Sequence, residues 1–315
     1  MYSSLCCFAD STVSWSRSPH TEDVRKENID LTADFILTDT AWWKEPTLLV
    51  NTSFVHSWSI SRKVHPYCPR LSLCCCYCQT CPFVDIGYSQ EKRIPLWRYL
   101  LPTCYNPDKI DSYVFDPKPK FLCAEYTIPP SMTGRHDTFA ACPTLEAPQV
   151  ENDVPQRPPY RWLLLGVTGT GGRVHIDHAG TSAWNAVVTG RKRWVFFPPH
   201  TEGHLLEDLH EGHPDERSDF WYQHKYHTVV KRVHEVTGIK PLEVTQRPGE
   251  VIYIPNGWWH IVRNETFTIA LTENFGNHPD GNEALHREFS KWDKRSADVW
   301  WKWYSAQHQQ QQQQQ

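Results

Sequence analysis

The strongest constraint on the fold is a succession of short strand-like segments between residues 161 and 274. They are rich in β-branched and aromatic residues, and turn residues separate them. The segments are RWLLLGV, GRVHID, SAWNAVV, KRWVFF, EVIYIP, WWHIVR and FTIALTENF. Many short strands in succession favour an antiparallel barrel or sandwich over a helical fold.

The second segment carries His175 and Asp177, and His260 lies far downstream in the stretch GWWH. Alternate side chains of a strand share a face, so His175 and Asp177 would project together. His260 would complete a set of two imidazoles and one carboxylate around a metal ion. Such a set leaves coordination positions open, as in non-heme Fe(II) oxygenases.

A lysine follows in the next pair of segments. A two-residue turn at residues 189–190 would pair Asn185 with Trp194 and would put Lys192 on the same face. With aromatic side chains on that face, it should be the barrel interior. A buried ammonium group needs an anionic partner, and a bound dicarboxylate would supply one.

A second turn bears on the face of His260. A three-residue loop at residues 264–266 would place Thr272 and Asn274 on that face. A two-residue loop would turn both side chains away, so the register stays open here.

The rest of the chain divides by composition. Residues 94–116 predict a short helix, a loop and a strand, and residues 201–240 predict an insertion with some helix. The apolar residues of 282–304 recur at helical spacing, so this helix should pack on its own domain, with a homodimer contact as the alternative. We expect a disordered N-terminus (1–30), an N-terminal extension (31–126), the barrel domain (127–276), a C-terminal helical segment (277–305) and a disordered Gln-rich tail (306–315).

Six of the eleven cysteines lie within residues 68–81. Cys75, Cys78 and Cys81 form two overlapping CxxC pairs, but no well-spaced second pair follows, as a structural zinc site normally requires. We favour a loop insertion with free thiols. A zinc site and an artefact of the gene model remain alternatives.

Charge and hydropathy narrow the choice of partners. The chain has 32 basic and 36 acidic residues, so no global basic field favours nucleic acid. It has no long apolar stretch of membrane-spanning length and no signal-peptide pattern near its beginning. We therefore expect an intracellular protein without a membrane partner, in the nucleus rather than the cytoplasm.

Three long motifs occur in order: RPPYRWLLLGVTGTGGRVHIDHAGTSAWNAVVTGRKRWVFFPP, PLEVTQRPGEVIYIPNGWWHIV and TFTIALTENF. They resemble the JmjC domain of the phosphatidylserine-receptor-type proteins, the bifunctional arginine demethylase and lysyl-hydroxylase family. The resemblance is strong over residues 157–276 and weak over 94–116. It implies a mainly β, cupin-like double-stranded β-helix (the JmjC jelly roll) with flanking helices, using Fe(II), 2-oxoglutarate and O2.

The resemblance also implies roles for single residues. It makes His175, Asp177 and His260 the iron ligands, and it places Lys192, Thr272 and Tyr113 at the distal carboxylate of 2-oxoglutarate, Asn185 beside the cosubstrate and Asn274 near the metal. Two positions depart from the family pattern. Gly172 stands where a threonine is usual, so one polar contact is in doubt, and His178 stands where proline is usual.

The implied activity is oxidation of a protein side chain. The substrate would be a lysine or a methylated arginine or lysine, with lysyl hydroxylation ahead of N-methyl demethylation. The alternative is a catalytically silent JmjC domain that serves as an interaction scaffold. A cupin enzyme acting on a small molecule without 2-oxoglutarate is disfavoured, because it would not need the inward lysine.

Overall fold

The structure is a computed structural model, and it describes most of the predicted barrel domain. The described residues are 25–28, 44–50, 55, 83–86, 92–105, 113–116, 126, 137–146, 154–206, 218–278 and 280–313. Residues 68–81 lie outside them, so the three interpretations of the cysteine-rich segment stay predictions.

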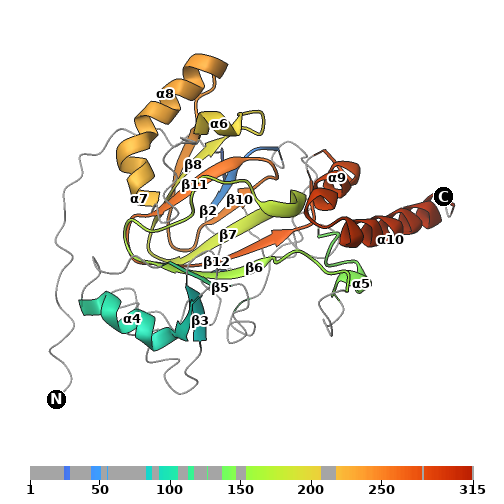
Figure 1. Cartoon of the computed structure of the whole chain (residues 1–315), viewed down its shortest axis with the longest axis horizontal. Helices are drawn as coiled ribbons and strands as arrows, with labels where there is room; N and C mark the ends of the chain where they lie inside the picture. Colours follow the sequence, from blue (N-terminus) through green and yellow to red (C-terminus); the bar gives the residue numbers. More distant parts are fainter. Residues whose placement is uncertain are drawn as a thin grey trace.

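Two β-sheets form the body of the molecule (Figure 1). The larger has nine described strands in the order β1-β2-β10-β7-β12-β6-β5-β3-β4, and the smaller has three in the order β11-β8-β9. The strands are β1 (Arg25–Asn28), β2 (Thr47–Val50), β3 (Phe83–Ile86), β4 (Lys92–Pro95), β5 (Val114–Asp116), β6 (Arg161–Gly166), β7 (Ser182–Thr189), β8 (Lys192–Phe197), β9 (Leu242–Gln246), β10 (Val251–Ile254), β11 (Trp259–Asn264) and β12 (Thr268–Phe275). All described pairings except β1 with β2 are antiparallel.

The sheets enclose an apolar interior. Buried side chains of both sheets pack together there: Ala183, Ile252 and Ile254 from the larger sheet, with Trp194, Phe196 and Val262 from the smaller. From β7 to β12 the chain crosses repeatedly between two facing sheets: β7, β10 and β12 belong to the larger sheet, and β8, β9 and β11 to the smaller. This arrangement confirms the mainly β, cupin-like double-stranded β-helix with flanking helices.

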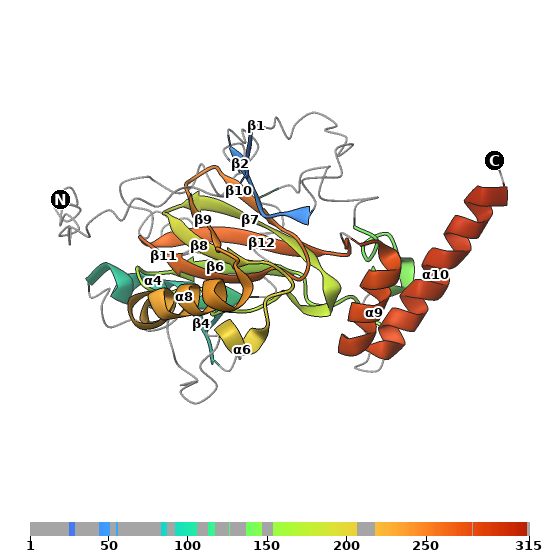
Figure 2. The same cartoon turned by 90° about the horizontal axis from the view of Figure 1, so that it is seen from above.

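Helices cover the outer faces of the sheets and one end of the molecule (Figures 1 and 2). Helix α4 packs on the larger sheet, and α8 packs on the smaller one. The helical segments are α4 (Leu96–Tyr105), α5 (Pro143–Glu146), η6 (His178–Gly180), α6 (Gly203–Leu206), α7 (Ser218–Phe220), η7 (Trp221–Lys225), α8 (Tyr226–Thr237), α9 (Asn282–Trp292) and α10 (Lys294–Gln313). None of the described helices combines the length and the hydropathy that crossing a bilayer requires.

The two predicted hairpins are wrong. Strand β7 pairs with β10 and β12, whereas β8 pairs with β9 and β11. Both edges of each strand are therefore occupied, and the turn at residues 189–190 carries the chain from one sheet to the other. The loop after β11 does the same, because β12 pairs with β6 and β7.

Two further elements differ from expectation. The segment GRVHID is not a strand. Its backbone contacts with β11 are an isolated bridge between His175 and His260 and one hydrogen bond from the Val262 N–H to the Gly172 carbonyl. Within residues 1–30, Arg25–Asn28 is a strand that runs parallel to β2. The predicted helix and strand of residues 94–116 are confirmed as α4 and β5.

The C-terminal segment forms two helices where a single helix was expected over residues 282–304. Asp293 has an extended backbone (φ −150°, ψ 99°), and its carboxylate accepts hydrogen bonds from the backbone N–H groups of Arg295 and Ser296. Asp293 thus ends α9 and caps α10. Helix α10 continues to Gln313, so most of the tail for which we expected disorder is helical.

Gly180, at the end of η6, lets helix α9 approach the HID segment (residues 175–177). Its φ is +74°, and a Cβ at this position would lie 2.6 Å from the Cβ of Glu288. Gly180→Ala should therefore lower the free energy of unfolding by about 2–4 kcal/mol, because backbone strain and overpacking add. Urea unfolding followed by circular dichroism measures the change.

Gly238 provides a matched control. It has the same φ of +74°, but a Cβ there would meet nothing within 4 Å. Gly238→Ala should carry only the backbone strain, about 1–2 kcal/mol. Equal losses in the two variants would contradict close packing of α9 at Gly180.

Candidate functional site

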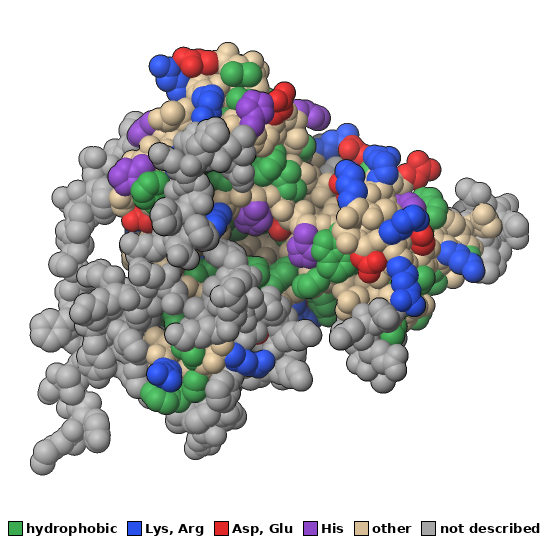
Figure 3. All heavy atoms as spheres, viewed as in Figure 1, with side chains coloured by type: hydrophobic (Ala, Val, Ile, Leu, Met, Phe, Trp, Pro, Cys, Tyr) green, Lys and Arg blue, Asp and Glu red, His purple; other side chains and the backbone are tan. Residues whose placement is uncertain are grey.

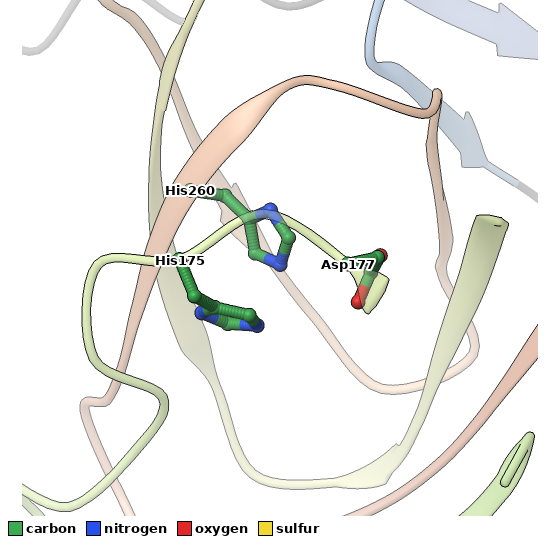
Figure 4. Close-up of side chains that lie close together, drawn as sticks. All are labelled: His175, Asp177 and His260. Carbon is green, nitrogen blue, oxygen red and sulfur yellow. The ribbon is translucent and has the colours of Figure 1, made fainter. Parts of the chain in front are cut away.

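The structure brings His175, Asp177 and His260 together (Figure 4). One ligand atom from each residue lies within 4.8 Å of the others. Two backbone hydrogen bonds hold the histidines in register: the His175 N–H donates to the His260 carbonyl at 3.0 Å, and the His260 N–H donates to the His175 carbonyl at 2.9 Å. A short bridge therefore replaces the strand that the sequence predicts for the HID segment.

Backbone carbonyls orient both imidazoles. The Nδ1 atom of His175 lies 2.6 Å from the carbonyl oxygen of Arg173, and that of His260 lies 3.0 Å from the carbonyl oxygen of Trp258. Nδ1 must carry the proton in each contact, because a carbonyl oxygen only accepts. The Nε2 lone pair of each ring is then available to a metal ion.

The carboxylate of Asp177 fits the same purpose. Its Oδ2 atom is buried and has no hydrogen-bond partner among the described residues. A buried carboxylate oxygen without a partner is unfavourable unless a cation is present. Two Nε2 atoms and this oxygen suit a divalent transition metal that keeps open coordination positions, as Fe(II) does in such sites.

Burial keeps His260 neutral. Desolvation first, and then the nearby His175, lower its pKa from 6.5 to about 4. The ring contacts Trp194 and Phe196, with centroids 6.0 and 6.1 Å away. A neutral imidazole is the form that binds metal, so no proton has to leave this ring at neutral pH.

Lys192 lies in the interior of the barrel. Its side chain is 1% exposed, and its Nζ donates a 2.9 Å hydrogen bond to Oδ1 of Asn264. Burial lowers its pKa from 10.5 to about 7. The interior orientation is as predicted, although the hairpin used to derive it is wrong, because the inward face follows from the alternation along β8 alone.

Sequence reasoning missed Asn264 and Thr170. Asn264 was assigned to a loop, but it ends β11 with its side chain buried, and its Nδ2 donates to Oγ1 of Thr170 at 3.0 Å. Gly166 leaves the space for both, because a Cβ there would lie 2.2 Å from Nδ2 of Asn264 and 2.3 Å from Oγ1 of Thr170. Thr170 thus adds a hydroxyl group to the hydrogen bonds that join Lys192 and Asn264. Gly172, which stands where a threonine is usual in the family, has no hydroxyl group.

The other four residues predicted for the cosubstrate and metal site are buried or half-buried, and their contacts differ. Tyr113 lies near the lysine, with 5.8 Å between Nζ and its ring centroid. Asn185 is buried, and its Oδ1 has no partner among the described residues. Thr272 pairs with Asn185 across the sheet and donates to the Trp184 carbonyl at 2.7 Å, whereas Nδ2 of Asn274 donates to Oγ1 of Thr181 at 2.9 Å.

The comparisons with known proteins agree with this geometry. The family profile described as "JmjC domain, hydroxylase" matches residues 162–275. The bifunctional arginine demethylase and lysyl-hydroxylase psr-1 of Caenorhabditis elegans is 38% identical over 182 residues, 54% of this chain and 41% of that protein.

Two other relatives carry related names. The arginine-specific demethylase JMJ22 of Arabidopsis thaliana is 36% identical over 52% of this chain and 31% of its own length. The human 2-oxoglutarate and iron-dependent oxygenase JMJD4 is 33% identical over 38% of this chain and 27% of its own length. The chain therefore spans less than half the length of these curated relatives.

Asp177→Ala should abolish stabilisation by metal. Anaerobic Fe(II) at 100 times its dissociation constant should raise the Tm of the wild type by about 5 °C, and should leave that of the variant unchanged. Differential scanning fluorimetry measures both. His234→Ala, which removes an exposed histidine of α8, should respond as the wild type does. An undiminished shift in Asp177→Ala would place the metal elsewhere.

Lys192→Met should change how stability depends on pH. The unfolded chain holds the lysine proton up to about pH 10.5, but the folded chain releases it near pH 7, so the wild type gains stability as pH rises between these values. The variant lacks this gain. The free energy of unfolding of Lys192→Met should therefore exceed that of the wild type most at pH 6. This difference should shrink by about 3 kcal/mol by pH 9.5.

Urea unfolding at pH 6, 8 and 9.5 tests this dependence. Lys231→Met, which removes a lysine whose side chain is 75% exposed, serves as the control. If the curves of Lys192→Met and the wild type stayed parallel, the Lys192 ammonium would be solvated in the folded protein.

Proposed function

Because this chain carries a JmjC domain, we propose that it is an Fe(II)- and 2-oxoglutarate-dependent protein oxygenase. The proposal rests on one observation above all: two oriented imidazoles and an unpartnered carboxylate converge in a barrel whose interior also holds a buried lysine. We further propose a lysine side chain as the substrate group, ahead of the N-methyl groups of arginine or lysine. Psr-1, a bifunctional arginine demethylase and lysyl-hydroxylase, supports both kinds of substrate, and JMJ22, an arginine-specific demethylase, supports the second.

The chain's own residues would divide the work. His175, Asp177 and His260 would hold the iron, with their Nε2 atoms and Oδ2. Lys192 would hold the distal carboxylate of 2-oxoglutarate, supported by the Asn264 amide. When bound, iron and 2-oxoglutarate supply the oxidation of an unactivated C–H bond by O2, with succinate and carbon dioxide as coproducts.

The lysine and the metal ligands lie at two ends of one strand pair. Lys192 pairs with Asn264, and His260 pairs with Phe196, four positions along the same ladder. Trp194 and Val262 fill the ladder between them, both less than 6% exposed. An apolar lining of this kind excludes water and strengthens the attraction between the ammonium and a carboxylate.

The lowered pKa of Lys192 has a consequence for the binding of an anionic cosubstrate. Without an anion, burial lowers its pKa to about 7, so part of the lysine population is neutral at neutral pH. A carboxylate beside the Nζ favours the charged form. Binding of 2-oxoglutarate above pH 7 would therefore take up a proton at this atom.

Two finer features belong to the same proposal. We propose a homodimer through the C-terminal helix, supported by the aromatic side chains Trp301, Trp303 and Tyr304, which are only partly buried on α10. Helix α10 also projects from the body of the molecule (Figure 2). A nuclear location is proposed with it, because nuclear proteins offer methylated arginine and lysine substrates.

Turnover should depend on Lys192. Wild-type protein should bind 2-oxoglutarate with Fe(II) under anaerobic conditions and should release succinate when air is admitted. Lys192→Met should weaken 2-oxoglutarate binding at least about 30-fold, because it removes one partner of a buried charge pair. Isothermal titration measures binding, and a coupled assay measures succinate.

Lys231→Met is the control for this experiment, and it should match the wild type. A peptide panel analysed by mass spectrometry then identifies the chemistry: gain of one oxygen indicates hydroxylation, and loss of one methylene indicates demethylation. If the wild type and Lys192→Met were both folded and equally inactive, the silent scaffold would replace the oxygenase as the better hypothesis.

A further inference from the structure

A pocket of about 470 Å³ opens beside Asp177. The HID segment and η6 form one of its walls, and helix α9 contributes Glu288, Lys291 and Trp292 to another. In the space-filling view, histidine side chains border a hollow near the centre of the molecule, and mixed acidic and basic side chains of the C-terminal helices lie to its right (Figure 3). A group that enters this pocket reaches the carboxylate of Asp177.

Close packing fixes α9 relative to Asp177. Gly180, three residues after Asp177, allows the backbone to approach the Cβ of Glu288. The ring of His178, the residue next to Asp177, lies 6.0 Å from the ring of Trp292, and its Nε2 lies 2.9 Å from the Pro159 carbonyl oxygen. Glu288 and Trp292 are therefore held at a set position beside the metal ligands.

Glu288 and Trp292 together suit a cation. They stand four residues apart on α9, so their side chains share one face of the helix. Trp292 is 41% exposed, which makes it one of four exposed large hydrophobic residues among those the structure describes. An exposed indole face next to a carboxylate attracts an ammonium or guanidinium group by cation–π and ionic contacts.

The carboxylate of Glu288 already binds an ammonium group. The Nζ of Lys291 lies 2.7 and 2.8 Å from its two oxygens. Both side chains of this pair are accessible, with 70% of Lys291 and 34% of Glu288 exposed. Exposed ion pairs contribute little free energy, so a cation that enters the pocket can displace Lys291.

We propose that Glu288 and Trp292 form the subsite that receives the cationic side chain of a protein substrate, with Lys291 occupying Glu288 until the substrate binds. This inference rests on the proposed oxygenase function and adds the residues that would bind the substrate. Asp177 is committed to the metal there, so Glu288 is the carboxylate of this pocket that remains for the substrate. The chemical class is a primary or methylated ammonium or guanidinium group on an extended side chain.

The test is a binding experiment with the full chain, saturated with Fe(II) under anaerobic conditions and without 2-oxoglutarate. The metal then occupies Asp177, and the outcome does not depend on turnover. The probe is a short fluorescein-labelled peptide of Gly, Ser and Ala with one central lysine, and its partner has norleucine at that position. Fluorescence anisotropy should show about threefold to tenfold tighter binding of the lysine peptide to the wild type.

Three variants separate the roles. Glu288→Gln should remove the preference for lysine over norleucine, and Lys291→Met should strengthen lysine binding by about twofold to threefold, because it removes the internal competitor. Trp292→Leu should weaken lysine binding more than norleucine binding. Glu283→Gln is the matched control, because Glu283 is an exposed acid of the same helix that does not line the pocket.

Each outcome decides the inference. Equal binding of the two peptides to the wild type, or an unchanged preference in Glu288→Gln, overturns it. Tighter binding of a peptide with a central glutamate, lost in Lys291→Met, also overturns it and makes Lys291 the recognition residue. Succinate release, measured on the same proteins, tests the oxygenase separately: it can fail while the lysine preference stands, or succeed while that preference is absent.

Discussion

The site depends on one interaction, the backbone bridge between His175 and His260. The HID segment lies outside any regular strand. This pair of hydrogen bonds joins it to β11, and the residues before it add a hydrogen bond from the Val262 N–H to the Gly172 carbonyl at 3.1 Å. Because β11 is paired along its full length with β8, the bridge ties one imidazole and the carboxylate to the most regular part of the smaller sheet. The ring of His175 then lies 4.1 Å from that of His260, centroid to centroid. Ligands from distant parts of the sequence are positioned by backbone geometry, which side-chain substitutions around the site leave largely intact.

At the other end of the barrel interior, Lys192 lowers the stability of the fold. An ammonium group in an apolar core is unfavourable, and here one amide oxygen is its described hydrogen-bond partner. The folded protein therefore keeps Lys192 close to losing its proton. Such a position costs stability but suits a site in which an anion supplies the missing charge. Asn185 also faces the interior, and its buried Oδ1 has no hydrogen-bond partner among the described residues. Buried polar atoms without partners, such as Oδ1 of Asn185 and Oδ2 of Asp177 among the described residues, are expected of a binding site and not of a core built for stability alone.

The sequence predicted the interior residues better than it predicted their partners. Alternation along a strand is local, so the inward orientation of Lys192 followed from β8 alone. Pairing is not local: the predicted hairpins assumed that β7 pairs with β8 and β11 with β12, whereas the chain passes to the other sheet at each of these turns. Asn264 was missed because asparagine is common in turns. Only its long-range contacts, with Thr170 and with Lys192, show that its side chain lies in the interior. Asp293 was missed for the opposite reason, because the apolar spacing across it continued while its side chain capped the next helix.

The candidate metal ligands and the proposed substrate subsite belong to different parts of the fold, which depend on different contacts. The ligands and Lys192 depend on strand pairing, which tolerates little change in position. Glu288 and Trp292 stand on a helix that joins the barrel through η6 and packs its apolar side on Phe139 and Trp300. A helix docked in this way can change its exposed face without disturbing the ladder of β8 and β11. Under the proposed function, substrate preference could therefore vary on α9 while the three candidate metal ligands stay the same, provided that Gly180 keeps the two in contact.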